Sequence, residues 1–90
     1  WIESGRTGAV MNFTSPAEVR AVRDRVARSR LKIPLIIGLD AVNGFATYLP
    51  QPIGWASTFN PRLIELAAYW SAREARAAGI NWTFAPMIDM

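Results

Sequence analysis

The sequence contains no cysteine and no histidine among its 90 residues. The lack of cysteine excludes a disulfide framework and a thiolate metal site, and the lack of histidine removes the commonest general base and zinc ligand. Acid–base chemistry within these residues therefore falls to aspartate or glutamate. Because a Gly-rich phosphate loop and a metal-ligand spacing are also missing, the sequence predicts no cofactor and no metal site.

Long apolar runs are lacking as well. The longest run is far short of the roughly 20 residues that a membrane-spanning helix needs, so no membrane span is predicted. With 51% hydrophobic and 19% charged residues, the composition is typical of a globular domain. The first residues already belong to an amphipathic segment and the last follow a buried-strand pattern. We therefore expect residues 1–90 to be one piece of a larger domain, poorly folded and catalytically inactive by themselves.

Positive charge is concentrated in one segment. The formal net charge is +3, and six of the ten basic residues lie between Arg20 and Lys32. Such a cluster can bind nucleic acid through phosphate contacts. Here, however, the basic residues surround an apolar stripe of Val19, Val22 and Val26 at helical spacing, and no aromatic residue is interleaved. This pattern favours a solvated helix face, and we predict no nucleic-acid partner.

Strand-like and helix-like segments alternate along the chain. Ser15-Pro16-Ala17-Glu18 and Asn60-Pro61 are helix starts, and Gly79 is a helix stop. The seven residues 33–39 are apolar without alternation, which predicts a strand covered on both faces. The predicted elements are a strand at 8–13, a helix from Ser15 to about Arg30, a strand at 33–40, a long loop at 41–59, a helix at 60–78 and a strand at 81–90. This order predicts an α/β fold with parallel βαβ units.

Two carboxylates lie at the ends of predicted strands, Asp40 at the end of the second and Asp89 near the end of the third. Ligands in parallel α/β folds bind at the carboxyl ends of the strands, so both are candidate site residues. A glycosidase, a metal-assisted hydrolase or a sugar-binding site could use them. The alternative is structural: Asp40 caps the following turn and Asp89 pairs with an arginine.

Four aromatic residues lie in and after the predicted loop: Phe45, Tyr48, Trp55 and Phe59. They could stack on sugar rings, or they could pin the loop onto the fold. The spacing favours the second interpretation. A loop of this length is uncommon in a compact domain unless it carries function, which points to this end of the sheet as the working face.

Four segments in the same order resemble the N-terminal barrel domain of family 3 glycoside hydrolases, and the bacterial β-glucosidases of that family in particular. The resemblance covers essentially the whole chain. The segments are Leu31-Lys32-Ile33-Pro34-Leu35, Asp40-Ala41-Val42-Asn43-Gly44, residues 49–60 and Trp82-Thr83-Phe84-Ala85-Pro86-Met87-Ile88-Asp89.

The resemblance implies a partial TIM-type (β/α)8 barrel, about three strands and two helices of it, from a retaining exo-acting β-glucosidase. It implies that Asp40 binds hydroxyls of the terminal nonreducing sugar, with Asp89 as a second-tier candidate. The family's nucleophile and acid/base motifs do not occur in these residues, so no catalytic residue is expected here. The implied partners are a β-glucoside or oligosaccharide substrate, the remainder of the barrel and a second domain. Bacterial relatives imply a periplasmic or secreted protein.

The sequence departs from the family pattern at Asn43, where members of this type usually have histidine. Asparagine keeps a donor and an acceptor but cannot carry charge, so we predict a modified substrate-binding role for it. An N-acetylhexosaminidase-like member of the family is one alternative, although Val42-Asn43-Gly44 stands where Glu-Gly-Gly would favour it. A non-catalytic carbohydrate-binding or interaction module is another.

Overall fold

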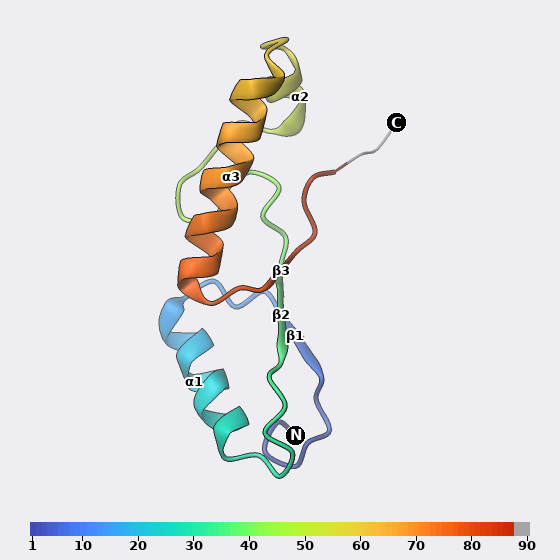
Figure 1. The fold of residues 1–90 in the computed structure, drawn as a ribbon, viewed down its shortest axis with the longest axis vertical. Coiled ribbons are helices and arrows are strands. Elements are labelled where there is room, and N and C mark those ends of the chain that lie inside the picture. The colour runs from blue at the N-terminus through green and yellow to red at the C-terminus, as the bar shows by residue number, and fades with distance from the viewer. Residues whose placement is uncertain (88–90) are drawn as a thin grey trace.

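The computed structural model describes residues 1–87, which form a parallel sheet with its two long helices on one face (Figure 1). The strands lie in chain order, with Ala9 opposite Ile36 and Gly38 opposite Trp82. The elements in order are β1 (Ala9–Met11), α1 (Pro16–Ala27), β2 (Ile36–Leu39), α2 (Pro52–Ala56), α3 (Pro61–Ala78) and β3 (Trp82–Thr83). This confirms the predicted α/β alternation and the parallel pairing.

Local capping explains where both long helices begin. Ser15 Oγ accepts a hydrogen bond from Ala17 N at 3.2 Å, and the Glu18 carboxylate accepts one from Ser15 N at 3.2 Å. At α3, Asn60 Oδ1 accepts from Leu63 N at 3.2 Å. These bonds satisfy amide groups that have no partner within the first turn of a helix. The predicted helix starts are therefore confirmed, although α1 ends at Ala27 rather than near residue 30.

The end of α3 is a left-handed glycine turn that also contacts α1. Gly79 has φ 101°, its N–H donates to Arg76 O at 2.9 Å, and Ile80 N donates to Ala75 O at 3.0 Å. This is the hydrogen-bond pattern of a Schellman turn. A Cβ at position 79 would lie 2.5 Å from Val19 Cγ1, so this turn packs directly against α1.

The core lies between the sheet and the two long helices. Ile37 of β2 is 2% exposed and Val19 of α1 is 1% exposed. The other buried hydrophobic residues are Val22, Leu35, Leu39, Ala41, Ala75 and Ile80. The Asn81 side chain binds the backbone of the strand segment next to this core: it accepts a hydrogen bond from Ile37 N at 2.7 Å and donates one to Leu35 O at 3.0 Å.

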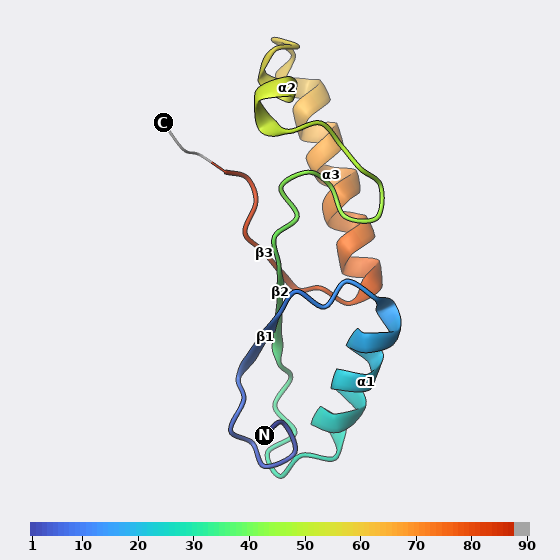
Figure 2. The same cartoon turned by 180° about the vertical axis from the view of Figure 1, so that it is seen from behind.

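Within residues 1–87 the opposite face of β2 is open, so the cover predicted for both faces of this strand is seen on one face. Ile36 is 47% exposed and Ile33 is 63% exposed. The reason is that both long helices lie on the other face of the sheet, as the reverse view also shows (Figure 2). On this face Gly38 is covered by an edge-to-face pair of Trp82 and Phe84, whose ring centroids are 4.7 Å apart.

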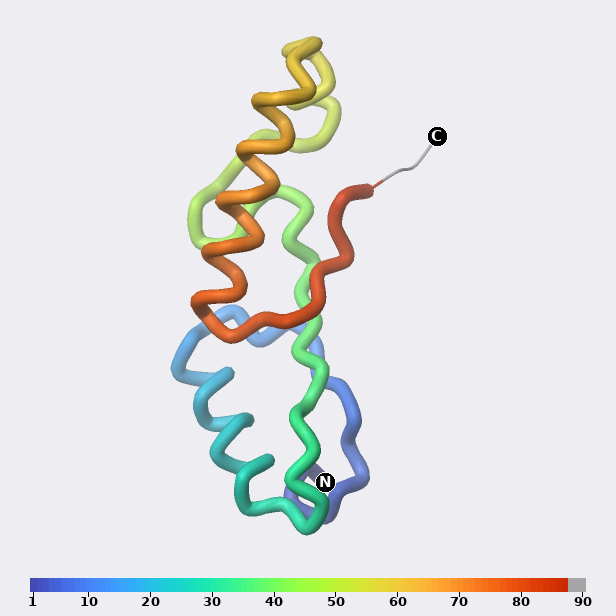
Figure 3. The backbone as a smooth tube through the Cα atoms, in the orientation of Figure 1, coloured from blue at the N-terminus to red at the C-terminus, as the bar shows by residue number. Residues whose placement is uncertain are grey.

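Two further predictions need correction. Residues 41–59 are not all loop, because α2 lies within them, so the described chain has three helices rather than two. The helix begins with Pro52 at its first position, where no N–H is needed. Within the described part of the predicted strand at 81–90, β3 is two residues long, since its ladder with β2 ends at Leu39 opposite Thr83; residues 88–90 lie outside the described residues. The tube in Figure 3 follows the chain from β2 through the segment that contains α2 to the start of α3.

Candidate functional site

Asp40 stands directly after the last residue of β2, at the carboxyl end of the sheet. It borders an open depression of about 370 Å³. Thr14, which follows β1, lies on the same rim, so two neighbouring strands open into this space. The lining residues are Thr14, Leu39, Asp40, Val42, Asn43, Gly44, Phe45, Ala46 and Tyr48.

The Asp40 side chain is exposed, and within residues 1–87 its carboxylate takes part in no hydrogen bond or ion pair. The structural alternative, in which Asp40 caps the following turn, is therefore not observed. An ionised carboxylate offers two acceptor oxygens and about four lone-pair directions. Asp40 thus presents an acceptor for hydroxyl or amide donors at the edge of the depression.

The loop after β2 brings Asn43 to the same depression. Asn43 O accepts a hydrogen bond from Leu49 N at 2.8 Å, which closes residues 43–49 into a compact turn. Gly44 has φ 87°, a left-handed conformation that side chains disfavour, and a Cβ there would collide with Thr47 O. The structure therefore places Asp40, at the end of β2, and Asn43, in the loop that follows, around one depression.

A third polar residue, Glu74 of α3, holds the far side of this loop and was not found from the sequence. Its carboxylate accepts from Ala46 N at 3.1 Å, from Thr47 N at 2.9 Å and from Thr47 Oγ1 at 3.0 Å. The hydrogen bond from the Thr47 backbone is the main reason that the pKa of Glu74 lies below its ordinary value of 4.5. Glu74 lies 27 and 28 positions from its partners, so no local sequence signal pointed to it.

The four aromatic residues do not form one stacking platform. Phe45 packs against the core, whereas Trp55 lines a separate groove beneath α3. Tyr48 borders the depression and is 88% exposed, and Phe59 is 92% exposed at the start of α3. Only Tyr48 and Phe45 are therefore near Asp40.

Asp89, the second predicted carboxylate, lies outside the described residues. Within residues 1–87, no group of three carboxylate, histidine or cysteine side chains comes together in a way that could hold a metal ion. No helix in the same part of the chain is long and apolar enough to span a membrane.

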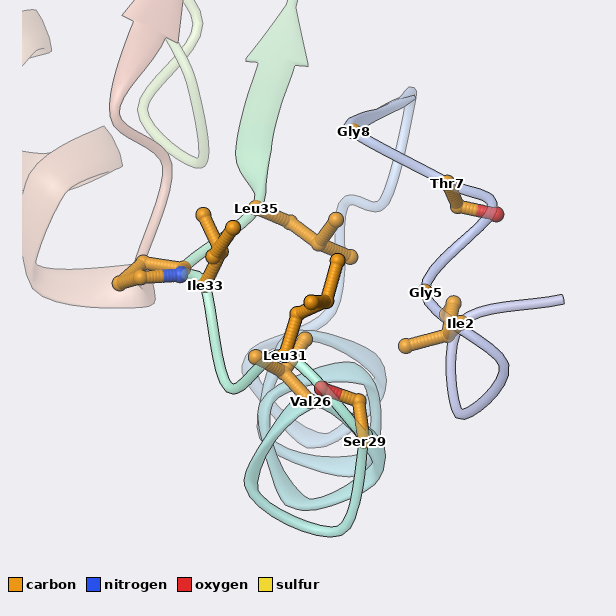
Figure 4. Close-up of a pocket in the computed structure, with 10 residues that line it drawn as sticks. Ile2, Gly5, Thr7, Gly8, Val26, Ser29, Leu31, Ile33 and Leu35 are labelled. Carbon is orange, nitrogen blue, oxygen red and sulfur yellow. The ribbon is translucent and has the colours of Figure 1, made fainter.

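A second pocket lies at the opposite end of the sheet and differs in chemistry. It is lined mainly by apolar residues from the N-terminal turn, the end of α1 and the segment before β2, including Ile2, Val26, Leu31 and Leu35 (Figure 4). Among the residues that the structure describes, no charged side chain lines it. Because ligands in parallel α/β folds bind at the carboxyl strand ends, this pocket is packing space and not a candidate active site.

Comparison with known proteins adds family information to this geometry. The family model "Glycosyl hydrolase family 3 N terminal domain" matches residues 1–90. A periplasmic β-glucosidase of Salmonella typhimurium is 41% identical over 90 residues, which is 99% of this chain and 12% of that protein. A lysosomal β-glucosidase of Dictyostelium discoideum is 42% identical over 64 residues, 66% of this chain and 8% of that protein.

A third relative, the β-N-acetylglucosaminidase/β-glucosidase of Cellulomonas fimi, is 33% identical over 89 residues, which is 92% of this chain and 16% of that protein. The chain thus spans between 8% and 16% of the length of these relatives. The resemblance seen in the sequence is confirmed: the chain belongs to glycosyl hydrolase family 3, within the N-terminal domain of that family.

Proposed function

We propose that residues 1–90 form the first part of a TIM-type (β/α)8 barrel in a retaining, exo-acting β-glycosidase. The enzyme removes terminal nonreducing β-D-glucosyl residues, and this part of it contributes binding residues for the sugar. Family membership and the names of the Salmonella and Dictyostelium relatives support the glycosidase class and the glucoside substrate. The three parallel strands with helices on one face support the barrel, because barrel strands are each followed by an outer helix.

The observation that carries this proposal is the position of the Asp40 carboxylate. It is exposed at the carboxyl end of β2, has no protein partner within residues 1–87, and faces the same depression as Asn43. Active sites of TIM-type barrels lie at this end of the strands. A carboxylate there accepts hydrogen bonds from two adjacent sugar hydroxyls, and the neutral Asn43 amide adds a donor and an acceptor. Asp89 is a further, second-tier candidate for the same sugar.

Hydrolysis with retention needs two other carboxyl groups about 5 Å apart, one to attack the anomeric carbon and one to protonate the leaving oxygen. The family resemblance assigns both to parts of the protein beyond residues 1–90. Asp40 therefore acts by holding the sugar and not as nucleophile. Its hydrogen bonds increase the rate to the extent that they strengthen as the ring approaches the transition state.

The same proposal covers the partners and the location. A β-glucoside or oligosaccharide is the substrate, and the remainder of the barrel and a second domain complete the site. The periplasmic name of the Salmonella relative supports a periplasmic location.

The test is the substitution Asp40→Ala in the full-length protein, with hydrolysis of an aryl β-glucoside as the readout. Loss of two hydrogen bonds to a charged group should lower kcat/KM about 100-fold. The matched control is Asp24→Ala, which removes an exposed carboxylate from α1 and should leave kcat/KM unchanged. An Asp40→Ala variant with the wild-type rate would refute the assigned role.

The name of the Cellulomonas relative makes an N-acetylglucosaminide the competing substrate. The full-length protein should have the higher kcat/KM on the aryl β-glucoside, because Val42-Asn43-Gly44 follows Asp40 instead of Glu-Gly-Gly. The reverse preference would favour the N-acetylhexosaminidase alternative. Sugar binding with no hydrolysis of either substrate would favour a non-catalytic module.

A further inference from the structure

We propose that Glu74 is a positioning residue for the sugar site, fixing the loop that carries Asn43 relative to Asp40. This inference rests on the proposed function, since it concerns the same depression. Glu74 itself does not line that depression and would not touch the sugar. It acts on the opposite side of the loop, through Ala46 and Thr47.

The loop is compact but has few internal bonds. Residues 43–49 are closed by the hydrogen bond from Leu49 N to Asn43 O and by isolated bridges of Gly44 with Val42 and Tyr48. The tip of the loop, at Ala46 and Thr47, is exposed. Without another partner, the amide groups of this tip would be left to water, and the tip would be free to tilt about its two ends.

Glu74 supplies that partner with three hydrogen bonds at once. One carboxylate oxygen accepts both backbone amides, at 3.1 and 2.9 Å, and the other accepts the Thr47 hydroxyl at 3.0 Å. A carboxylate is the strongest acceptor that a side chain can offer to neutral donors. Three bonds from one rigid group fix both the position and the rotation of the tip.

The helix that presents this carboxylate is itself anchored at this point. Ser71 and Ala75, on either side of Glu74 in the sequence, are 8% and 4% exposed, and they are the buried residues of α3. Ala75 belongs to the same core as Leu39 and Ala41, which flank Asp40. Contacts therefore connect the core to Glu74, Glu74 to the loop tip, and the loop tip through Gly44 to Asn43. In this way the positions of Asp40 and Asn43 are fixed relative to one another.

The test compares three variants of the full-length protein with a control. Glu74→Gln removes the charge and one acceptor oxygen, Thr47→Val removes only the hydroxyl donor, and Thr47→Ser keeps that donor. The control is Glu65→Gln, the same change at an exposed position of α3 whose side chain makes no hydrogen bond within residues 1–87. The readouts are KM and kcat on an aryl β-glucoside and the inhibition constant of D-glucose.

Glu74→Gln should raise KM and the glucose inhibition constant about tenfold, with kcat changed less than about twofold, because binding contacts are lost and the reacting carboxyls are untouched. Thr47→Val should give a smaller rise in the same direction, and Thr47→Ser should restore the wild-type values. The loop peptide covering residues 43–49 should also exchange amide hydrogens faster in Glu74→Gln than in Glu65→Gln.

Unchanged KM and inhibition constant in Glu74→Gln, whatever its stability, would overturn the inference. If that variant does not fold, the Thr47→Val and Thr47→Ser pair decides the question, since equal values for both would also overturn it. A wild-type protein that hydrolyses no β-glycoside and binds no D-glucose would instead refute the proposed function. Hydrogen exchange at residues 43–49 would then still decide whether Glu74 holds the loop.

Discussion

The chain contains two βα units: β1 followed by α1, and β2 followed by α3. They differ in how completely the helix covers the strands of the sheet. In the first unit, α1 buries Val19 and Val22 against β2, at 1% and 6% exposure. In the second unit, α3 is longer, yet its buried residues are the small Ser71 and Ala75 in its C-terminal half. Its N-terminal half extends past the strand ends, with α2 beside it (Figure 1). The helix of the first unit thus forms much of the buried core. The helix of the second unit extends beyond the carboxyl ends of the strands, beside the loop that follows β2.

The largest expected effect comes from placing a charge in the core between α1 and the sheet. Val19→Asp should lower the free energy of unfolding by about 4 kcal/mol, because an unpaired carboxylate would be buried between α1 and the sheet. The measurement is the urea midpoint of the full-length protein, followed by tryptophan fluorescence.

The matched control for Val19→Asp lies on α3. Leu66 is 52% exposed, so Leu66→Asp should cost less than about 1 kcal/mol. Equal losses for the two variants would mean that the outer face of α3 is as deeply buried in the whole protein as Val19, and the contrast between the units would not hold.

A second prediction concerns the point where the two units meet. Gly79→Ala should cost about 2 to 3 kcal/mol, since alanine disfavours φ 101° and its Cβ would lie 2.5 Å from Val19 Cγ1. Gly8→Ala is the control, because a Cβ at position 8 meets no atom within 4 Å and should change stability by about 0.5 kcal/mol at most. Thermal unfolding of both variants measures the difference. A Gly79→Ala variant as stable as Gly8→Ala would show that the units do not depend on this contact.

The smallest expected effect is the pH dependence of the second unit. The pKa of Glu74 is lowered in the folded chain, so the ionised form stabilises the fold above the ordinary value of 4.5. That contribution is lost as the pH falls through the lower, folded pKa, because the protonated carboxyl gives up acceptor capacity. Urea unfolding of wild type and Glu74→Gln should therefore differ at neutral pH and converge in acid. A difference that persists unchanged into acid would contradict this linkage.

The parts of the fold that were predicted from the sequence depend on neighbouring residues. Ser15 and Glu18 cap α1 through bonds within three positions, and Gly79 ends α3 through bonds to the preceding turn. Asp40 was chosen as a candidate in the same way, because it is the first polar residue after an apolar run, and its role in binding stays a prediction. Signals of this kind are visible in a single sequence because the physical cause and its effect lie a few residues apart.

The parts that were missed depend on distant residues or on missing neighbours. Glu74 reaches the loop across 27 positions, and Asn81 joins Leu35 and Ile37 across 46 and 44. Nothing near either residue marks it as more than an exposed polar side chain. The short α2 has no hydrophobic period to detect. The open face of β2 followed from the arrangement of helices, which the apolar run alone did not specify.

The sequential strand order also bears on how the protein is made. Strands β1 and β2 pair in register within residues 9–38, and α1 lies between them in the chain. The residues of a complete βαβ unit are therefore synthesised before those of α3. The side-chain hydrogen bonds of Asn81 with Leu35 and Ile37 form only after α3 has been made, so the first unit is completed by residues that follow it in the chain.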